Sequence, residues 1–184
     1  MSNETAPMNI ILGVTASIAA YKVADIASKL TKQDHSVHVV MTPGATQFIT
    51  PLTLQTLSRH PVTTNIFDEK MSWHPGHIEL ADNADLVLIA PATADIIAKL
   101  AHGFADDALT AIVLATEAPL LLAPAMNGKM WLHPATVANV EILRQRGADF
   151  IGPEEGMLAC GYEGIGRLWP ADEIVAKALQ YKKR

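Results

Sequence analysis

The sequence predicts an α/β fold: a single doubly wound parallel sheet, Rossmann-like or flavodoxin-like, with helices on both faces. Short apolar runs alternate with segments of helical periodicity along the chain. Such runs are typical of strands that are buried on both faces of a parallel sheet, and their alternation with helices is typical of repeated β–α units. A length of 184 residues, with no internal repeat and no linker-like stretch, indicates one domain.

Each expected element follows from its own local pattern. Strands are placed on the apolar runs and helices on the segments whose apolar residues recur every three or four positions. The expected strands are residues 9–14, 37–41, 85–90, 120–123 and 148–151, with a further short strand at 62–67. The expected helices are residues 19–30, 45–48, 51–57, 77–84, 96–101, 107–115, 134–146 and 171–179, and residues 152–166 are expected to form a glycine-rich loop.

Composition and charge restrict the class of protein. Residues 1–8 are expected to be a disordered tail, because they lack the apolar segment of a signal peptide, and 9–184 to be the domain. No apolar run reaches the roughly 20 residues that span a bilayer. The formal net charge is −5 and no basic stripe is present, so nucleic acid is not an expected partner. With a single cysteine and no leader, we expect a cytoplasmic protein.

The first two expected strands indicate the kind of nucleotide that the fold would bind. Only Gly13 stands where a dinucleotide fold has three glycines, and the second strand ends at Thr42 where such a fold has an acidic residue for the ribose. This pattern favours a phosphate-bearing mononucleotide such as FMN over NAD. Ser17 opens the helix that follows, where it could cap the helix or contact a phosphate.

A second ligand crevice is expected where the strand at 85–90 turns into a helix. Crevices at the carboxyl ends of strands are where open α/β sheets bind ligands. Thr93 and Asp95 lie in this turn and could cap the helix or hydrogen-bond a ring system.

His74 and His77 could together suggest a metal-binding site, but their spacing does not support one. Pro75 and Gly76 lie between them and break any helix that would place both rings on one face. No further Cys or His spacing completes a zinc site, so no metal is expected. His74 is expected to be solvated, whereas His77 begins a helix, where the dipole favours a neutral imidazole suited to act as a base.

Asn127 and Cys160 are the remaining candidates. Asn127 lies in the sequence Pro-Ala-Met-Asn-Gly-Lys-Met-Trp directly after a buried strand, where it could be a simple helix cap or a functional amide. Cys160 could be a small buried residue, but its glycine-rich surroundings favour a loop that closes over a substrate.

Taken together and in order, motifs from Asn9 to Arg167 resemble the homo-oligomeric flavin-containing cysteine decarboxylases. The family often has glycine where this chain has Ala16. The resemblance implies FMN as cofactor, and catalytic roles for His77, Asn127 and Cys160. It implies FMN contacts from Ala16, Ser17, Ile18, Thr42, Thr93, Ala94, Asp95, Ile96 and Ala125, and substrate contacts from Asn127, Met157, Leu158 and Ala159.

The activity that the resemblance implies is the redox-neutral decarboxylation of 4′-phosphopantothenoylcysteine to 4′-phosphopantetheine in coenzyme A biosynthesis. It also implies a homo-oligomer, a trimer or dodecamer, with active sites at subunit interfaces. One alternative is the oxidative decarboxylation of peptidyl-cysteine in lantibiotic maturation, which would not need Cys160 as a proton donor. Others are a flavin-binding regulatory protein, whose long acidic tail this sequence lacks, and a nucleotide-binding module without chemistry.

Overall fold

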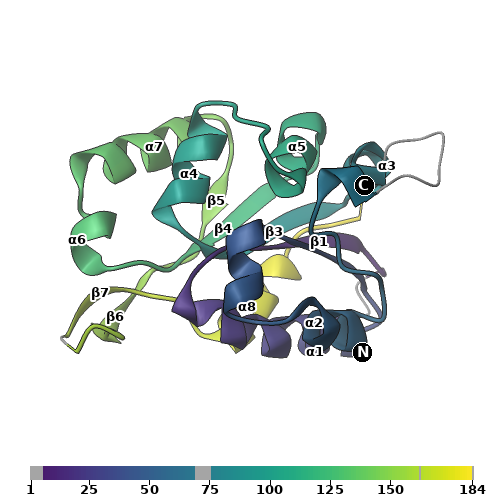
Figure 1. The fold of residues 1–184 in the computed structure, drawn as a ribbon, viewed down its shortest axis with the longest axis horizontal. Coiled ribbons are helices and arrows are strands. Elements are labelled where there is room, and N and C mark those ends of the chain that lie inside the picture. The colour runs from purple at the N-terminus through teal and green to yellow at the C-terminus, as the bar shows by residue number, and fades with distance from the viewer. Residues whose placement is uncertain (1–5, 69–75, 162, 184) are drawn as a thin grey trace.

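The computed structural model describes residues 6–68, 76–161 and 163–183. Its centre is a parallel sheet of five strands in the order β2-β1-β3-β4-β5 (Figure 1). The strands are β1 (Asn9–Val14), β2 (Ser36–Met41), β3 (Leu86–Ala92), β4 (Leu120–Pro124) and β5 (Asp149–Phe150). This topology confirms the predicted doubly wound, flavodoxin-like α/β class.

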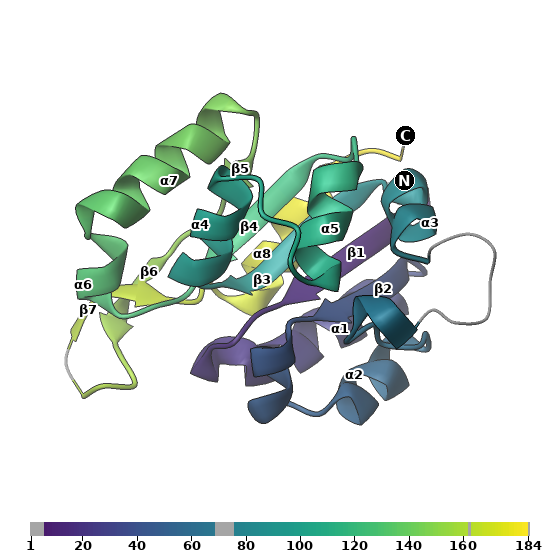
Figure 2. The same ribbon diagram turned by 45° about the horizontal axis from the view of Figure 1, so that its top comes forward.

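Helices cover both faces of the sheet, as Figures 1 and 2 show. One face carries α1 (Val23–Lys32), α2 (Pro51–Ser58) and α8 (Ala171–Ala178). The other carries α3 (Gly76–Asn83), α4 (Ala94–Ala101), α5 (Ala108–Ala115) and α7 (Pro134–Gln145). Among the described residues no helix is long and apolar enough to cross a membrane.

The side chains of each strand alternate between two cores, one on each face of the sheet. Leu12 and Leu88 pack with Ile26 of α1 in the first core. Their neighbours Ile11 and Val87 pack in the second core, with helices α4 and α5. All seven residues of β3 are buried, which explains why its sequence is continuously apolar instead of alternating.

The expected glycine-rich loop is the main error in the sequence-based prediction of the fold. Residues 154–167 form an antiparallel pair, β6 (Glu154–Met157) and β7 (Glu163–Arg167). The strands were missed because their glycines and charged residues produce no apolar alternation. The strand expected at 62–67 was also wrong in extent: Thr63 makes an isolated parallel bridge to Val40, and a 3₁₀ helix, η3, covers Ile66–Asp68.

The remaining short elements lie at the carboxyl ends of the strands. The 3₁₀ helices η1 (Ile18–Lys22) and η2 (Pro43–Gln47) follow β1 and β2, and α6 (Gly128–Trp131) follows β4. The chain leaves β1 toward one face of the sheet and leaves β3 toward the other. A crevice therefore opens between the carboxyl ends of β1 and β3, the switch point of the fold.

The N-terminal end of the domain is anchored through a histidine. Met8, which was expected to belong to the tail, is buried in the first core, and its N–H donates to Nδ1 of His35 at 3.1 Å. Since Nδ1 accepts this bond, the neutral ring carries its proton on Nε2, which is buried and finds no hydrogen-bond partner in the described part of the chain. Burial lowers the pKa of His35 against the smaller opposing effect of Asp34.

We therefore expect His35 to make the protein less stable in mild acid. Its pKa is lower in the folded than in the unfolded chain, so the unfolded chain binds the proton more readily. Stability from this ring is complete above the unfolded pKa of about 6.5 and is lost as the pH falls below it. Urea unfolding between pH 8 and pH 5 should show a smaller loss of unfolding free energy for His35→Gln than for the wild type. His102→Gln, at an exposed position, is the control, and parallel curves for His35→Gln and wild type would contradict the assignment.

Candidate functional site

Two adjoining cavities lie at the carboxyl ends of the strands. The first, here called the switch-point cavity, has a volume of about 530 Å³ and is formed by the turns after β1, β2, β3 and β4. The second, the hairpin cavity, measures about 660 Å³ and lies between η1, the turn after β4 and the β6–β7 hairpin. Ser17, Ala125 and Met126 line both cavities, so a ligand in one would meet a ligand in the other.

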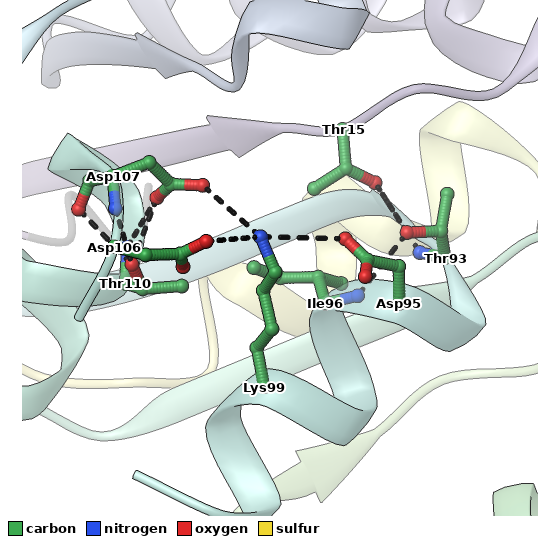
Figure 3. A network of polar contacts seen from close by, with 8 residues as sticks. All are labelled: Thr15, Thr93, Asp95, Ile96, Lys99, Asp106, Asp107 and Thr110. Carbon is green, nitrogen blue, oxygen red and sulfur yellow. Dashed lines mark hydrogen bonds and ion pairs between the residues drawn. The ribbon is translucent and has the colours of Figure 1, made fainter. Parts of the chain in front are cut away.

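Hydrogen bonds of two threonines, Thr15 and Thr93, connect the turns that form the switch-point cavity (Figure 3). Thr15, after β1, donates from Oγ1 to the carbonyl of Pro91 at 2.6 Å and accepts the N–H of Thr93 at 3.2 Å. Thr93 Oγ1 in turn accepts the N–H of Ile96 at 3.3 Å and caps α4. These bonds join the ends of β1 and β3, and they fix the hydroxyl of Thr93 as the helix cap that the sequence allowed.

Lys99 forms an ionic cluster at the wall of the same cavity. Its Nζ lies 2.9 Å from Asp106, 3.7 Å from Asp95 and 4.0 Å from Asp107. The hydrogen bond that Lys99 donates to Asp106 raises the pKa of Lys99 and lowers the pKa of Asp106. Figure 3 shows the ammonium group between the carboxylates of α4 and of the segment before α5. The cluster ties these two segments together and leaves Lys99 with its charge already matched.

Among the described residues, the side chain of Asn127 makes two hydrogen bonds, one to the backbone of α6 and one to Cys160. Its Oδ1 accepts the N–H of Lys129 at 2.9 Å, which caps α6. Its Nδ2 donates toward Sγ of Cys160 at 3.4 Å. The tertiary structure thus brings together the amide and the thiol, which are 33 positions apart in the sequence.

The hairpin that carries Cys160 is docked on the turn after β4 by backbone contacts. The N–H of Met126 donates to the carbonyl of Gly166 at 3.0 Å. Glycine is required on both sides of this contact: a Cβ at Gly128 would lie 2.6 Å from the carbonyl oxygen of Ile165, and one at Gly166 would clash with the carbonyl of Met126. Gly166 also has a φ of 140°, which side chains disfavour.

Most of the site residues that the sequence analysis predicted line one of the two cavities. The switch-point cavity is lined by Ala16, Ser17, Thr42, Thr93, Ala94, Asp95 and Ala125. The hairpin cavity is lined by Ile18, Asn127, Met157, Leu158, Ala159 and Cys160. Ile96 is buried in the second core, and its N–H donates to Oγ1 of Thr93.

His77 is the exception. It lies at the start of α3 and lines neither cavity. In Figures 1 and 2, α3 and the β6–β7 hairpin lie at opposite ends of the molecule. A single chain therefore does not bring His77 to Asn127 and Cys160. His74 lies outside the described residues, and among those described no group of three or more His, Cys, Asp or Glu residues is placed to hold a metal ion.

Sequence reasoning missed Lys99 and Asp107, which line the switch-point cavity. Tyr21, Lys22 and Arg167 lie within the motifs that carry the family resemblance but were given no role of their own, and they line the hairpin cavity. The spacing of Asp95 and Lys99, one helical turn apart, could have indicated their pairing. The sequence does not show that Lys22 and Arg167 line one cavity, because segments far apart in the chain form that cavity.

A protein-family model described as Flavoprotein matches residues 1–182. The chain belongs to the Flavoprotein family.

Curated members of the family include a probable phosphopantothenoylcysteine decarboxylase of Streptococcus mutans. It is 48% identical to this chain over 170 residues, which cover 91% of this chain and 95% of the relative. The coenzyme A biosynthesis bifunctional protein CoaBC of Bacillus subtilis is 49% identical over 173 residues, 94% of this chain. The match covers only 43% of that relative, so the chain spans less than half the length of the bifunctional proteins.

Solved structures of several proteins share the fold of this chain. A cysteine-to-serine variant of a PPC decarboxylase, complexed with pantothenoylaminoethenethiol, superposes with a TM-score of 0.84 at 32% identity, over 94% of this chain and 96% of that one. The FMN-dependent cysteine decarboxylase SpaF gives 0.83 at 33% identity, over 95% and 97%. The FMN-binding protein AtHal3 gives 0.81 at 32% identity, over 93% and 94%.

The docking of the hairpin predicts that Gly166→Ala will detach it. The added methyl group meets the carbonyl of Met126 and a backbone that side chains disfavour, with a cost of about 1–3 kcal/mol. Limited proteolysis should then cleave residues 154–167 several-fold faster than in the wild type, while urea unfolding of the remaining domain changes little. Gly147→Ala is the matched control, because Gly147 also has a positive φ, of 90°, but a Cβ there meets no atom within 4 Å. Equal protection of the hairpin in both variants would contradict the docking role.

Proposed function

We propose that this chain is an FMN-dependent decarboxylase that converts 4′-phosphopantothenoylcysteine to 4′-phosphopantetheine in coenzyme A biosynthesis. The observation that carries the proposal is the pairing of Asn127 with Cys160 at 3.4 Å, in a cavity that opens onto the switch point of a flavodoxin-like sheet. The Streptococcus mutans relative and two of the solved neighbours support the same activity, since they are named as decarboxylases of this substrate or of cysteine.

The residues of the switch-point cavity fit FMN. Its wall combines the polar groups of Thr42, Thr93 and Asp95 with the apolar side chains of Met126 and Met130, which suits a ring system with apolar faces and polar edges. Ala16, Ser17 and Ile18 form the turn from β1 into η1, where the resemblance places the phosphate. When bound, FMN supplies the chemistry of accepting a hydride from the substrate and returning it.

The residues of the hairpin cavity would handle the substrate. Nδ2 of Asn127 is a donor for the carboxylate that leaves as carbon dioxide, and its position is held because Oδ1 caps α6. Met157, Leu158 and Ala159 would contact the rest of the substrate. Removal of a hydride from the cysteine β-carbon and a proton from its thiol makes a thioaldehyde, which accepts the electron pair that decarboxylation leaves. Return of the hydride together with a proton from the Cys160 thiol then gives the saturated thiolate. Protons from solvent restore both thiols, so the net change is loss of carbon dioxide and uptake of one proton.

We infer that the active site is completed by a second copy of the chain. His77 lies on α3, away from Asn127 and Cys160 of its own chain, so its proposed acid–base or orienting role requires another subunit. A homo-oligomer, a trimer or dodecamer with sites at subunit interfaces, meets this requirement. A monomeric mass by light scattering would contradict it. We place the protein in the cytoplasm, with a small-molecule substrate and no nucleic-acid or membrane partner.

Mass spectrometry of the reaction product tests the proposed function. The purified, FMN-loaded protein is incubated with 4′-phosphopantothenoylcysteine, and we expect loss of carbon dioxide alone. A product two hydrogens lighter would mean that the enethiol is released, and would favour the oxidative reaction of the peptidyl-cysteine enzymes. No conversion with flavin bound would favour a flavin-binding regulatory protein.

Cys160→Ser should separate the two halves of the reaction. The serine hydroxyl is a much weaker acid than a thiol, so oxidation and decarboxylation should proceed while reduction of the enethiol stalls. We expect FMN binding to be retained, saturated product to fall by at least about 100-fold, as for loss of a general acid, and the unsaturated product to accumulate. The enethiol bound to the serine variant of a PPC decarboxylase supports this expectation. Full turnover by the variant would refute the role of Cys160 as proton donor.

A further inference from the structure

The wall of the hairpin cavity is positively charged, although the chain as a whole is negative. The chain has 14 Lys and Arg against 19 Asp and Glu, for a net charge of −5. Among the described residues that line the cavity, the charged ones are Lys22 and Arg167, both of them cations. A cavity with two cations and no carboxylate in its wall is suited to an anionic group of a ligand.

Lys22 is available to pair with such a group. It is half-buried at the end of η1, and among the described residues it takes part in none of the ion pairs, whereas Lys29 and Lys99 are each held by carboxylates. Partial burial with an unmatched charge makes an ammonium group a stronger partner for a ligand than a solvated lysine.

Arg167 provides the second cation from the opposite wall. It lies on β7 and its side chain passes over Gly156, where a Cβ would come within 2.8 Å of Nη1. Nη2 lies 3.4 Å from Oε2 of Glu154, and the Arg167 side chain is 44% exposed. Because Glu154 offsets part of this charge and orients the guanidinium, we treat Arg167 as a supporting contact and Lys22 as the principal one.

The position of Lys22 distinguishes between the two anionic groups of the proposed substrate. The carboxylate at the reacting end belongs beside Asn127 and Cys160, next to the cavity border at Ser17. Lys22 is the last residue of η1, the 3₁₀ helix that Ser17 caps, so about 10 Å of helix axis separates Lys22 from Ser17. The group that remains for Lys22 is the phosphate at the far end of the substrate.

We propose that Lys22, supported by Arg167, binds the 4′-phosphate and selects phosphorylated pantothenoylcysteine over substrates that lack the phosphate. This inference rests on the proposed function, because it assumes that substrate. It assigns a specificity to the hairpin cavity that Asn127 and Cys160 alone do not supply, since these two residues would act equally on any C-terminal cysteine.

The test compares 4′-phosphopantothenoylcysteine with pantothenoylcysteine as substrates of the FMN-loaded protein and of Lys22→Met, which keeps the apolar stem of the side chain. We expect Lys22→Met to raise KM for the phosphorylated substrate about 10- to 100-fold, the size of one charge-assisted contact. KM for the unphosphorylated substrate should change less than about twofold, and FMN affinity, measured by flavin fluorescence, should not change. Lys32→Met makes the same charge change at an exposed site on α1 and should behave as wild type. Arg167→Met should give a smaller rise that is confined to the phosphorylated substrate.

Two outcomes would overturn the assignment. Equal losses with both substrates would mean that Lys22 acts on the carboxylate or on the fold, and a fall in FMN affinity would mean that it contacts the cofactor. Calorimetric binding of 4′-phosphopantetheine and of pantetheine separates this inference from the proposed function. If the wild type turns over neither substrate but Lys22→Met still weakens only the phosphorylated ligand, the reaction is wrong and the phosphate site stands. If binding of both ligands is unaffected, the phosphate site is wrong.

Discussion

The change of helix side between β1 and β3 is the constraint on which the rest of this structure depends. Because the chain leaves these neighbouring strands in opposite directions, their carboxyl ends are left open. The hydroxyl of Thr15 links the two strand ends, because it donates a hydrogen bond to the carbonyl of Pro91 and accepts one from the N–H of Thr93. The turns after β2 and β4 complete the walls of the cavity at the carboxyl ends of these strands. The sheet topology thus determines where the proposed FMN site lies, and the individual side chains determine its lining.

The position of the β6–β7 hairpin depends on its contacts with the turn after β4. Among the described residues of the hairpin only Leu158 and Gly166 are buried. The hairpin is held instead by the backbone bond from Met126 to Gly166 and by the close approach of two glycines. The hairpin positions Cys160 beside Asn127, and an element with few buried contacts costs little free energy to detach.

Charge is arranged differently in the two cavities. At the switch point, Lys99 is surrounded by carboxylates and its role is to join segments of the scaffold. In the hairpin cavity, Lys22 has no such partner among the described residues, and Arg167 has one. The same residue type therefore has a structural role in one cavity and is available to a ligand in the other, and the difference lies in the neighbours that the fold supplies.

The sequence by itself determined the parallel sheet, its two covered faces and the candidate residues Ser17, Thr93, Asn127 and Cys160. These follow from local signals: continuous apolar runs mark strands buried on both sides, and turn residues mark the points where the strands end. Only the tertiary structure decided that Asn127 meets Cys160, that residues 154–167 contain two strands, that His77 lies away from both, and that Lys22 and Arg167 line the same cavity. The reason is physical. Such contacts join segments far apart in the chain through packing and backbone hydrogen bonds, and these leave no periodicity in either segment from which they could be read.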